Sequence, residues 1–302
     1  MIDRDEVRAG LTGPISSLAT PFTRDGAVDH DGLRGLIDAN LAGGSRTALL
    51  TWGDSLFSVL TDDEIAEVTA TVADHARGRA LTVAADSDWW TGKTVEFARY
   101  CREIGIDVLM VKPPVWSPPG REEFVEHYRA VAAEIPVMLV TNVWGGMPDV
   151  ALSVAAELLD RVDGVVALKD DMGGEPARKL TAMAGERWAV FAGGQKQNHL
   201  DLVHYGAVGY MSTFVSFQPE VSRRYWNAVC AGDWAAAARV VEQDDWPLFD
   251  YLMSLPGGFD GGFHAVLEVF GVVPRWRRPP MVNLDDAQLE RLDAFCRERG
   301  WK

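Results

Sequence analysis

A single lysine closes the apolar run from Gly164 to Leu168, and two aspartates, Asp170 and Asp171, follow it. A run this short, rich in β-branched residues and free of charge is typical of a buried strand in a parallel sheet. Because a lysine has no place inside such a strand, we expect Lys169 at its carboxyl end, which in α/β barrels is the catalytic end. An amine held there, partly out of water, can attack a carbonyl carbon. A structural ion pair with Asp170 or Asp171 explains the same residue equally well.

Other residues that could do chemistry also follow apolar runs. The Thr51-Trp52-Gly53 turn comes after the run 47–50, and its hydroxyl and N–H groups could hold a carboxylate, although a plain strand-end turn is the commoner case. Asp86 and Asp88 follow the run 80–85 and could form an acid–base pair or a magnesium site. A solvated loop is favoured there, because no third ligand has a recognisable spacing. Further polar residues at expected strand ends include Thr141, Asn142, Gln195, Lys196 and Ser212.

Tryptophans gather after four consecutive apolar runs, at positions 52, 89, 90, 116 and 144. Indole rings at the mouth of a barrel would make it narrow and apolar, which suits an aromatic or otherwise bulky substrate group. A subunit interface, where tryptophan is also enriched, explains the cluster equally well.

The elements that must position these residues alternate along the chain. Helix-length segments such as 31–41, with its helical apolar period, and the capping box Thr61–Glu64 separate the apolar runs. Such alternation predicts an α/β fold with a parallel sheet, and eight units predict a (β/α)8 TIM barrel. An open doubly wound sheet is the second choice, because the Gly43-Gly44 pair precedes its strand and cannot form a phosphate loop. The expected strands are 15–19, 47–50, 80–85, 107–111, 136–140, 165–168, 188–192 and 207–212.

After the eighth run the pattern becomes helical. We expect residues 1–218 to form the barrel core and residues 219–302 to form a C-terminal helical extension packed on the barrel, because no linker-like segment separates the two. The predicted helices of this extension are 219–231, 234–255, 262–270 and 285–299.

Composition narrows the class of protein. The chain has 302 residues, a formal net charge of −15 and no basic stripe, which argues against a nucleic-acid partner. Three widely spaced cysteines argue against disulfides or a zinc site and fit a reducing cytoplasm. We expect a cytoplasmic protein with no cofactor and no metal. We find no signal peptide and no apolar run long enough to span a membrane.

Six short motifs occur in a consistent order. They are Thr20-Pro21-Phe22 with Asp25-Gly26, the segment 51–55, the helix start 61–64, the segment 166–170, the segment 206–212 and Arg278-Pro279-Pro280. In this order they resemble the dihydrodipicolinate synthase/N-acetylneuraminate lyase family over most of the chain.

The resemblance implies class I aldolase or dehydratase chemistry on a (β/α)8 barrel, usually a homodimer or homotetramer. Lys169 would form an imine with pyruvate or another 2-keto acid. Thr51 and the backbone of Trp52 would hold its carboxylate, and Thr141 would stand at the proton-carrier position. The other residues that we expect to contact the substrate are Trp116, Asn142, Gln195, Met211 and Ser212.

Three departures from the family pattern qualify this expectation. Thr141 replaces the tyrosine that moves protons, Trp52 replaces the second threonine of the segment 51–55, and Trp116 replaces another tyrosine. A threonine hydroxyl is shorter and less acidic than a phenol, so a bound water, a substrate group or Thr141 acting through water would carry the proton. We therefore expect a diverged carbon–carbon lyase or dehydratase acting on a bulky substrate. The alternatives are a metabolite-binding protein without turnover and a metal-dependent reaction at Asp86 and Asp88.

Overall fold

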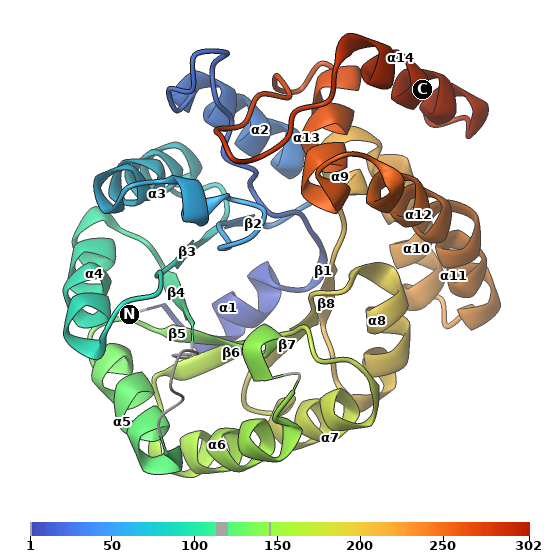
Figure 1. The fold of residues 1–302 in the computed structure, drawn as a ribbon. Coiled ribbons are helices and arrows are strands. Elements are labelled where there is room, and N and C mark those ends of the chain that lie inside the picture. Colours follow the sequence, from blue (N-terminus) through green and yellow to red (C-terminus); the bar gives the residue numbers. More distant parts are fainter. Residues whose placement is uncertain (1, 113–119, 145) are drawn as a thin grey trace.

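Eight parallel strands form a nearly closed barrel. The computed structural model describes residues 2–112, 120–144 and 146–302. Within these, the strands follow the order β1-β8-β7-β6-β5-β4-β3-β2. The bridge between Ser17 and Leu49, with a 2.8 Å hydrogen bond from Leu18 N to Leu49 O, brings the first strand to the second (Figure 1). The predicted (β/α)8 TIM barrel is confirmed. The strands are β1 Gly13–Ile15, β2 Thr47–Leu49, β3 Leu81–Ala85, β4 Val108–Val111, β5 Val137–Val140, β6 Val165–Asp170, β7 Ala189–Ala192 and β8 Gly209–Met211.

The first strand differs from its prediction. It begins at Gly13 and pairs with β8 only as far as Ile15, because beyond Ile15 the chain turns toward β2 and bridges Leu49 through Ser17. The apolar run 15–19 is nevertheless buried throughout. Buried residues therefore continue beyond the end of regular strand pairing. For this reason the apolar run predicted the strand too far along the chain.

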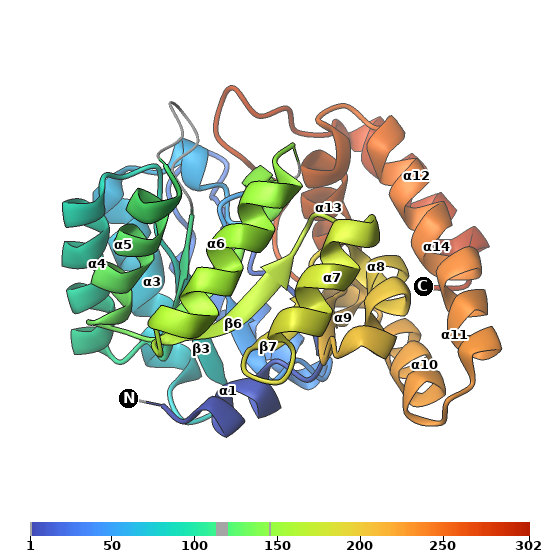
Figure 2. The same ribbon diagram turned by 90° about the horizontal axis from the view of Figure 1, so that it is seen from below.

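Helices surround the barrel, as the ring of coiled ribbons in Figure 1 shows. The capping box that opens α3 is formed as predicted, since Thr61 Oγ1 accepts from Glu64 N at 3.2 Å and Glu64 Oε2 accepts from Thr61 N at 2.9 Å. Helix α1 was not predicted and lies at the end of the barrel where the strands begin (Figure 2). The helices up to β8 are α1 Arg4–Gly10, α2 His30–Ala42, α3 Asp62–Ala76, α4 Thr91–Ile104, α5 Arg121–Ala132, α6 Pro148–Arg161, α7 Gly174–Ala184 and α8 Gln195–Leu202.

The C-terminal residues are helical and share a core with the barrel. One apolar cluster joins Ala192 of β7 and Tyr210 of β8 to Tyr225, Leu252 and Leu292 of the later helices. The segment predicted as one helix over 234–255 contains a π-helical turn at Val241–Asp245. The later helices are α9 Phe214–Phe217, α10 Pro219–Cys230, α11 Trp234–Val240, α12 Trp246–Ser254, α13 Gly258–Val269 and α14 Asp286–Glu298. Among the described residues, no helix combines the length and apolarity needed to cross a bilayer.

Candidate active site

Lys169 lies one residue before the end of β6, at the carboxyl end of the barrel. It is in register with Val140 of β5 and Phe191 of β7, so these two neighbouring strands hold the backbone of Lys169 in place. Its side chain is 12% exposed. The position is therefore the one predicted from the apolar run, at the edge where the loops that follow the strands converge.

The amine of Lys169 pairs with Asp171, two residues away. Nζ lies 2.7 Å from Asp171 Oδ1 and 2.5 Å from Oδ2, and the Asp171 side chain is 19% exposed. A Cβ atom added at Gly193 would lie 1.8 Å from Asp171 Oδ1 and 2.8 Å from Lys169 Nζ. The pair therefore occupies space that only a glycine at position 193, just past β7, leaves open.

Thr141 lies beside Lys169, as expected from neighbouring strands, and its backbone N–H donates to Lys169 O at 3.2 Å. Its buried hydroxyl donates to Asp170 Oδ1 at 3.0 Å and accepts from the N–H groups of Asp171 and Met172 at 2.8 and 3.2 Å. These three hydrogen bonds hold the backbone of the β6–α7 loop. The hydroxyl therefore sets the position of Asp171 and is committed to that loop.

Asp170 is fully buried and anchors the same loop. Its Oδ2 accepts from Gly173 N at 3.2 Å, and its backbone carbonyl accepts from Gly193 N at 2.7 Å. Burial raises the pKa of this carboxyl, while the bonds from Gly173 and Thr141 oppose the shift. Asp170 thus joins the loop to β7, and Asp171 alone of the two aspartates meets the lysine.

The turn after β2 brings a second carboxyl to the mouth. Thr51 is buried, and its N–H donates to Ser55 Oγ at 3.0 Å, while the Ser55 hydroxyl donates to Leu18 O at 2.6 Å. Asp54 accepts a hydrogen bond from Ser17 Oγ. Burial raises the pKa of Asp54, and the bond from Ser17 and the charge of Lys169 oppose that rise. Asp54 is therefore close enough to interact electrostatically with the lysine.

Helix α13 adds a third carboxyl, Asp260, which no sequence pattern singled out. Its charge and that of Asp171 both raise the pKa of Asp54. Burial raises the pKa of Asp260 itself, and the Arg277 guanidinium opposes that shift. Arg277 is buried, and burial lowers its pKa, against the effect of Asp260. Asp54, after β2, therefore interacts electrostatically with Lys169 and with two further carboxylates, Asp171 after β6 and Asp260 on α13.

The remaining predicted substrate contacts are placed differently from one another. Met211 ends β8 and packs in the apolar cluster of the barrel, and Asn142 is exposed after β5. Ser212 Oγ accepts from Lys196 Nζ at 3.1 Å and lies 2.8 Å from Ser222 Oγ of α10. Gln195 has a positive φ of 67° and accepts from Thr213 N at 3.2 Å. The predicted contact at Trp116 lies outside the described residues.

Asp86 and Asp88 do not share a site. The buried Asp86 accepts from Lys112 N at 2.8 Å and Thr94 Oγ1 at 3.3 Å, and burial raises its pKa to about 8. Asp88 pairs instead with Lys112 Nζ at 2.7 Å. Within the described ranges, no group of three or more histidine, cysteine, aspartate or glutamate side chains is placed to hold a metal ion.

The described tryptophans make separate contacts. Trp52 Nε1 donates to Asp86 O at 2.6 Å, so this ring lies between the turn after β2 and the end of β3. Trp144 is buried edge-on against Phe124, 5.8 Å between ring centroids, whereas Trp90 is 72% exposed. The indole rings at 52, 90 and 144 therefore do not form one common wall, and Trp52 joins the turn after β2 to the end of β3.

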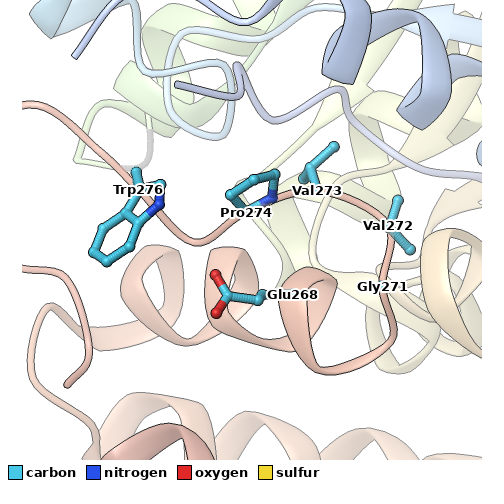
Figure 3. A pocket seen from close by; sticks show the side chains of 6 residues that line it. All are labelled: Glu268, Gly271, Val272, Val273, Pro274 and Trp276. Atoms are coloured by element: carbon cyan, nitrogen blue, oxygen red, sulfur yellow. The ribbon is translucent and has the colours of Figure 1, made fainter. Parts of the chain in front are cut away.

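A surface pocket of about 420 Å³ lies elsewhere. It is lined by Glu268 of α13, by residues 271–274 and by Trp276 (Figure 3). None of the described residues that the sequence predicted for the site lines this pocket. We therefore keep the mouth around Lys169 as the candidate active site.

The chain is similar to proteins of one family over most of its length. A family model described as the dihydrodipicolinate synthetase family matches residues 10–298. The chain belongs to this family. A 4-hydroxy-tetrahydrodipicolinate synthase from Sorangium cellulosum is 32% identical over 234 residues, which cover 75% of this chain and 76% of the relative. The family predicted from the order of motifs is thus confirmed.

Solved structures of dihydrodipicolinate synthetase family members and of a related lyase share the fold. A prophage protein of the dihydrodipicolinic acid synthase family from E. coli K12, in complex with pyruvate, is 22% identical with a TM-score of 0.82, over 96% of this chain and 99% of that one. N-acetylneuraminate lyase from Mycoplasma synoviae is 18% identical with a TM-score of 0.81, over 97% and 99%. These two structures therefore show that the barrel fold is shared.

Two residues near Lys169 and Asp54 were not predicted as site residues from the sequence. Asp171 entered it only as a structural ion-pair partner, although its place two residues after Lys169 was a visible signal. Asp260 lies 206 positions after Asp54 in the chain (260 − 54) and gave no signal, because only packing of α13 brings the two together.

Proposed function

We propose that this protein is a carbon–carbon lyase, aldolase or dehydratase that binds a 2-keto acid as an imine on Lys169. The observation that carries the proposal is an amine, 12% exposed, at the carboxyl end of β6 with a carboxylate on its Nζ. An imine of this kind withdraws electrons from the neighbouring carbon and favours bond cleavage or loss of water there. Membership of a family with synthases and lyases supports this class of reaction.

The carboxylate of the keto acid would dock on the turn after β2. The Thr51 N–H is used by Ser55, so the donors for a carboxylate would be the Thr51 hydroxyl and the N–H groups of Trp52 and Gly53. The electrostatic interaction of Asp54, in this turn, with Lys169 supports that docking position. The pyruvate complex of the E. coli prophage protein makes pyruvate the natural first probe.

Borohydride trapping tests the proposal. The protein is incubated with pyruvate and other 2-keto acids, reduced with sodium borohydride, digested and examined by peptide mass spectrometry. We expect a reduced adduct on the peptide that contains Lys169, none in Lys169→Ala, and an unchanged yield in Lys179→Met, which alters an exposed lysine of α7. No adduct with any 2-keto acid, together with unchanged ligand binding in Lys169→Ala, would instead indicate a binding protein without turnover.

A further inference from the structure

The contact between Lys169 and Asp171 suggests a proton carrier for the imine. Both carboxylate oxygens of Asp171 lie within 2.7 Å of Lys169 Nζ. Only 12% of the lysine side chain and 19% of the aspartate side chain are exposed. A carboxylate in direct contact with a shielded amine can accept a proton from it without passing through bulk water.

The other candidate groups at the mouth are committed elsewhere. The Thr141 hydroxyl bonds Asp170 and the backbone of the β6–α7 loop. Asp170 accepts from Thr141 and Gly173, and Asp54 accepts from Ser17. Among the described residues, Asp171 is the carboxylate that contacts Nζ. We propose that Asp171 carries the protons of imine formation at Lys169, an inference that rests on the proposed function above.

Imine formation requires only Lys169, the keto acid and Asp171. Asp171 takes a proton from the Lys169 ammonium, and the free amine attacks the keto carbon, forming the C–N bond while the carbonyl π electrons move to oxygen. Protonated Asp171 then gives its proton to that oxygen and takes one from the nitrogen of the adduct. It finally protonates the hydroxyl, which leaves as water while the nitrogen lone pair forms the C=N bond. The products are the protonated imine, water and the Asp171 carboxylate.

Other carboxyl groups lie close to Lys169 and Asp171. Asp54, from the turn after β2, interacts electrostatically with both Lys169 and Asp171, and Asp170 lies beside Lys169 on β6. The negative charge of Asp171 raises the pKa of both Asp54 and Asp170. Gly193 provides the space in which the Asp171 carboxylate meets Nζ.

The test measures the rate of imine formation rather than its yield. Protein and pyruvate are mixed, reduced with borohydride after increasing times, and the Lys169 adduct is quantified by mass spectrometry. We expect Asp171→Asn to slow the reaction by roughly 10²–10⁴-fold, and Asp171→Glu to recover part of the rate. Glu175→Gln, which removes an exposed carboxylate four residues further on, should leave the rate unchanged.

Two further readouts separate a proton carrier from a merely structural ion pair. Formate added to Asp171→Ala should restore part of the rate, because a small carboxylate can occupy the vacated space. The rate in Asp171→Asn should rise more steeply with hydroxide concentration than in the native protein, because solvent must then remove the ammonium proton. Circular dichroism checks that each variant is folded, and Asp171→Glu serves if the asparagine variant is not.

The outcomes distinguish this inference from the proposed function. If the native protein forms no adduct, both fall. If it forms the adduct and Asp171→Asn forms it equally fast, only the role of Asp171 is overturned. A slow Asp171→Ala variant without formate rescue, and with the native pH profile, would also overturn it.

Discussion

At the scale of single residues, the chemistry of the site depends on which neighbour each polar group already contacts. Lys169 and Asp171 contact each other, while Thr141 and Asp170 hold the backbone that presents them. Residue 141 is a threonine, and the carboxylate of Asp171 contacts the amine of Lys169 directly. The identity of residue 141 alone does not reveal this contact.

The buried Thr141 hydroxyl gives a prediction at this scale. Thr141→Val should destabilise the protein by about 1–3 kcal/mol, because it removes the hydrogen bond to Asp170 Oδ1 and those from the N–H groups of Asp171 and Met172. The same variant should form the Lys169 adduct more slowly, since the loop that carries Asp171 is released. Urea unfolding and timed borohydride trapping measure the two effects. Thr141→Ser keeps the hydroxyl and should retain both properties, whereas equal stability of the valine and serine variants would contradict this role.

At the scale of elements, a buried ion pair joins α8 to the π-helical turn that precedes α12. Lys196 Nζ donates to Asp245 Oδ1 at 2.5 Å, and Lys196 N donates to Asp245 Oδ2 at 3.2 Å. The lysine side chain is fully buried and the aspartate side chain is 4% exposed. Since α8 follows β7 of the barrel and Asp245 belongs to the later helices, this pair fixes how the two parts meet.

Loss of one partner should therefore be costly. Lys196→Met leaves the Asp245 carboxyl buried without its cation and should cost about 3–5 kcal/mol of unfolding free energy. Burial already raises the pKa of Asp245, opposed mainly by the charge of Lys196, so the substitution raises that pKa further. When folding raises the pKa of a carboxyl, the protein loses stability as the pH rises from the unfolded-state pKa of that group to its folded-state pKa.

The stability lost in Lys196→Met should therefore depend on pH. The deficit of Lys196→Met relative to the native protein should be larger at pH 8 than at pH 5, as urea unfolding at both values would show. The double variant Lys196→Met with Asp245→Asn should recover part of the loss. Lys179→Met, at an exposed pair, should change little at either pH. A deficit that does not depend on pH would mean that packing, and not the Asp245 charge, is lost.

At the scale of the whole molecule, a net charge of −15 opposes the approach of an anionic substrate. The carboxylates of Asp54 and Asp171, which interact with Lys169, add to this field. At low pyruvate concentration, the rate of adduct formation should rise by about two- to fivefold when salt is raised from roughly 0.01 M to 0.1 M, where the Debye length falls from about 30 to 10 Å. At saturating pyruvate the rate should not change. A rate that falls with salt would indicate a cationic path to the amine.

The succession of eight apolar runs, the α3 capping box and the place of Lys169 near the end of β6 could be predicted from the amino-acid sequence. These features depend on residues close together in the chain, where apolar runs and helix caps can be recognised. The folded structure was needed to show that Asp171 contacts the amine beside Gly193, that the Thr141 hydroxyl bonds the β6–α7 loop, and that Asp260 of α13 interacts with Asp54. The folded structure also shows a shift of the β5–β6 register between Val137 and Met138, before Lys169 is reached. Such contacts join residues on separate elements, so they depend on how those elements pack, which a local pattern does not encode.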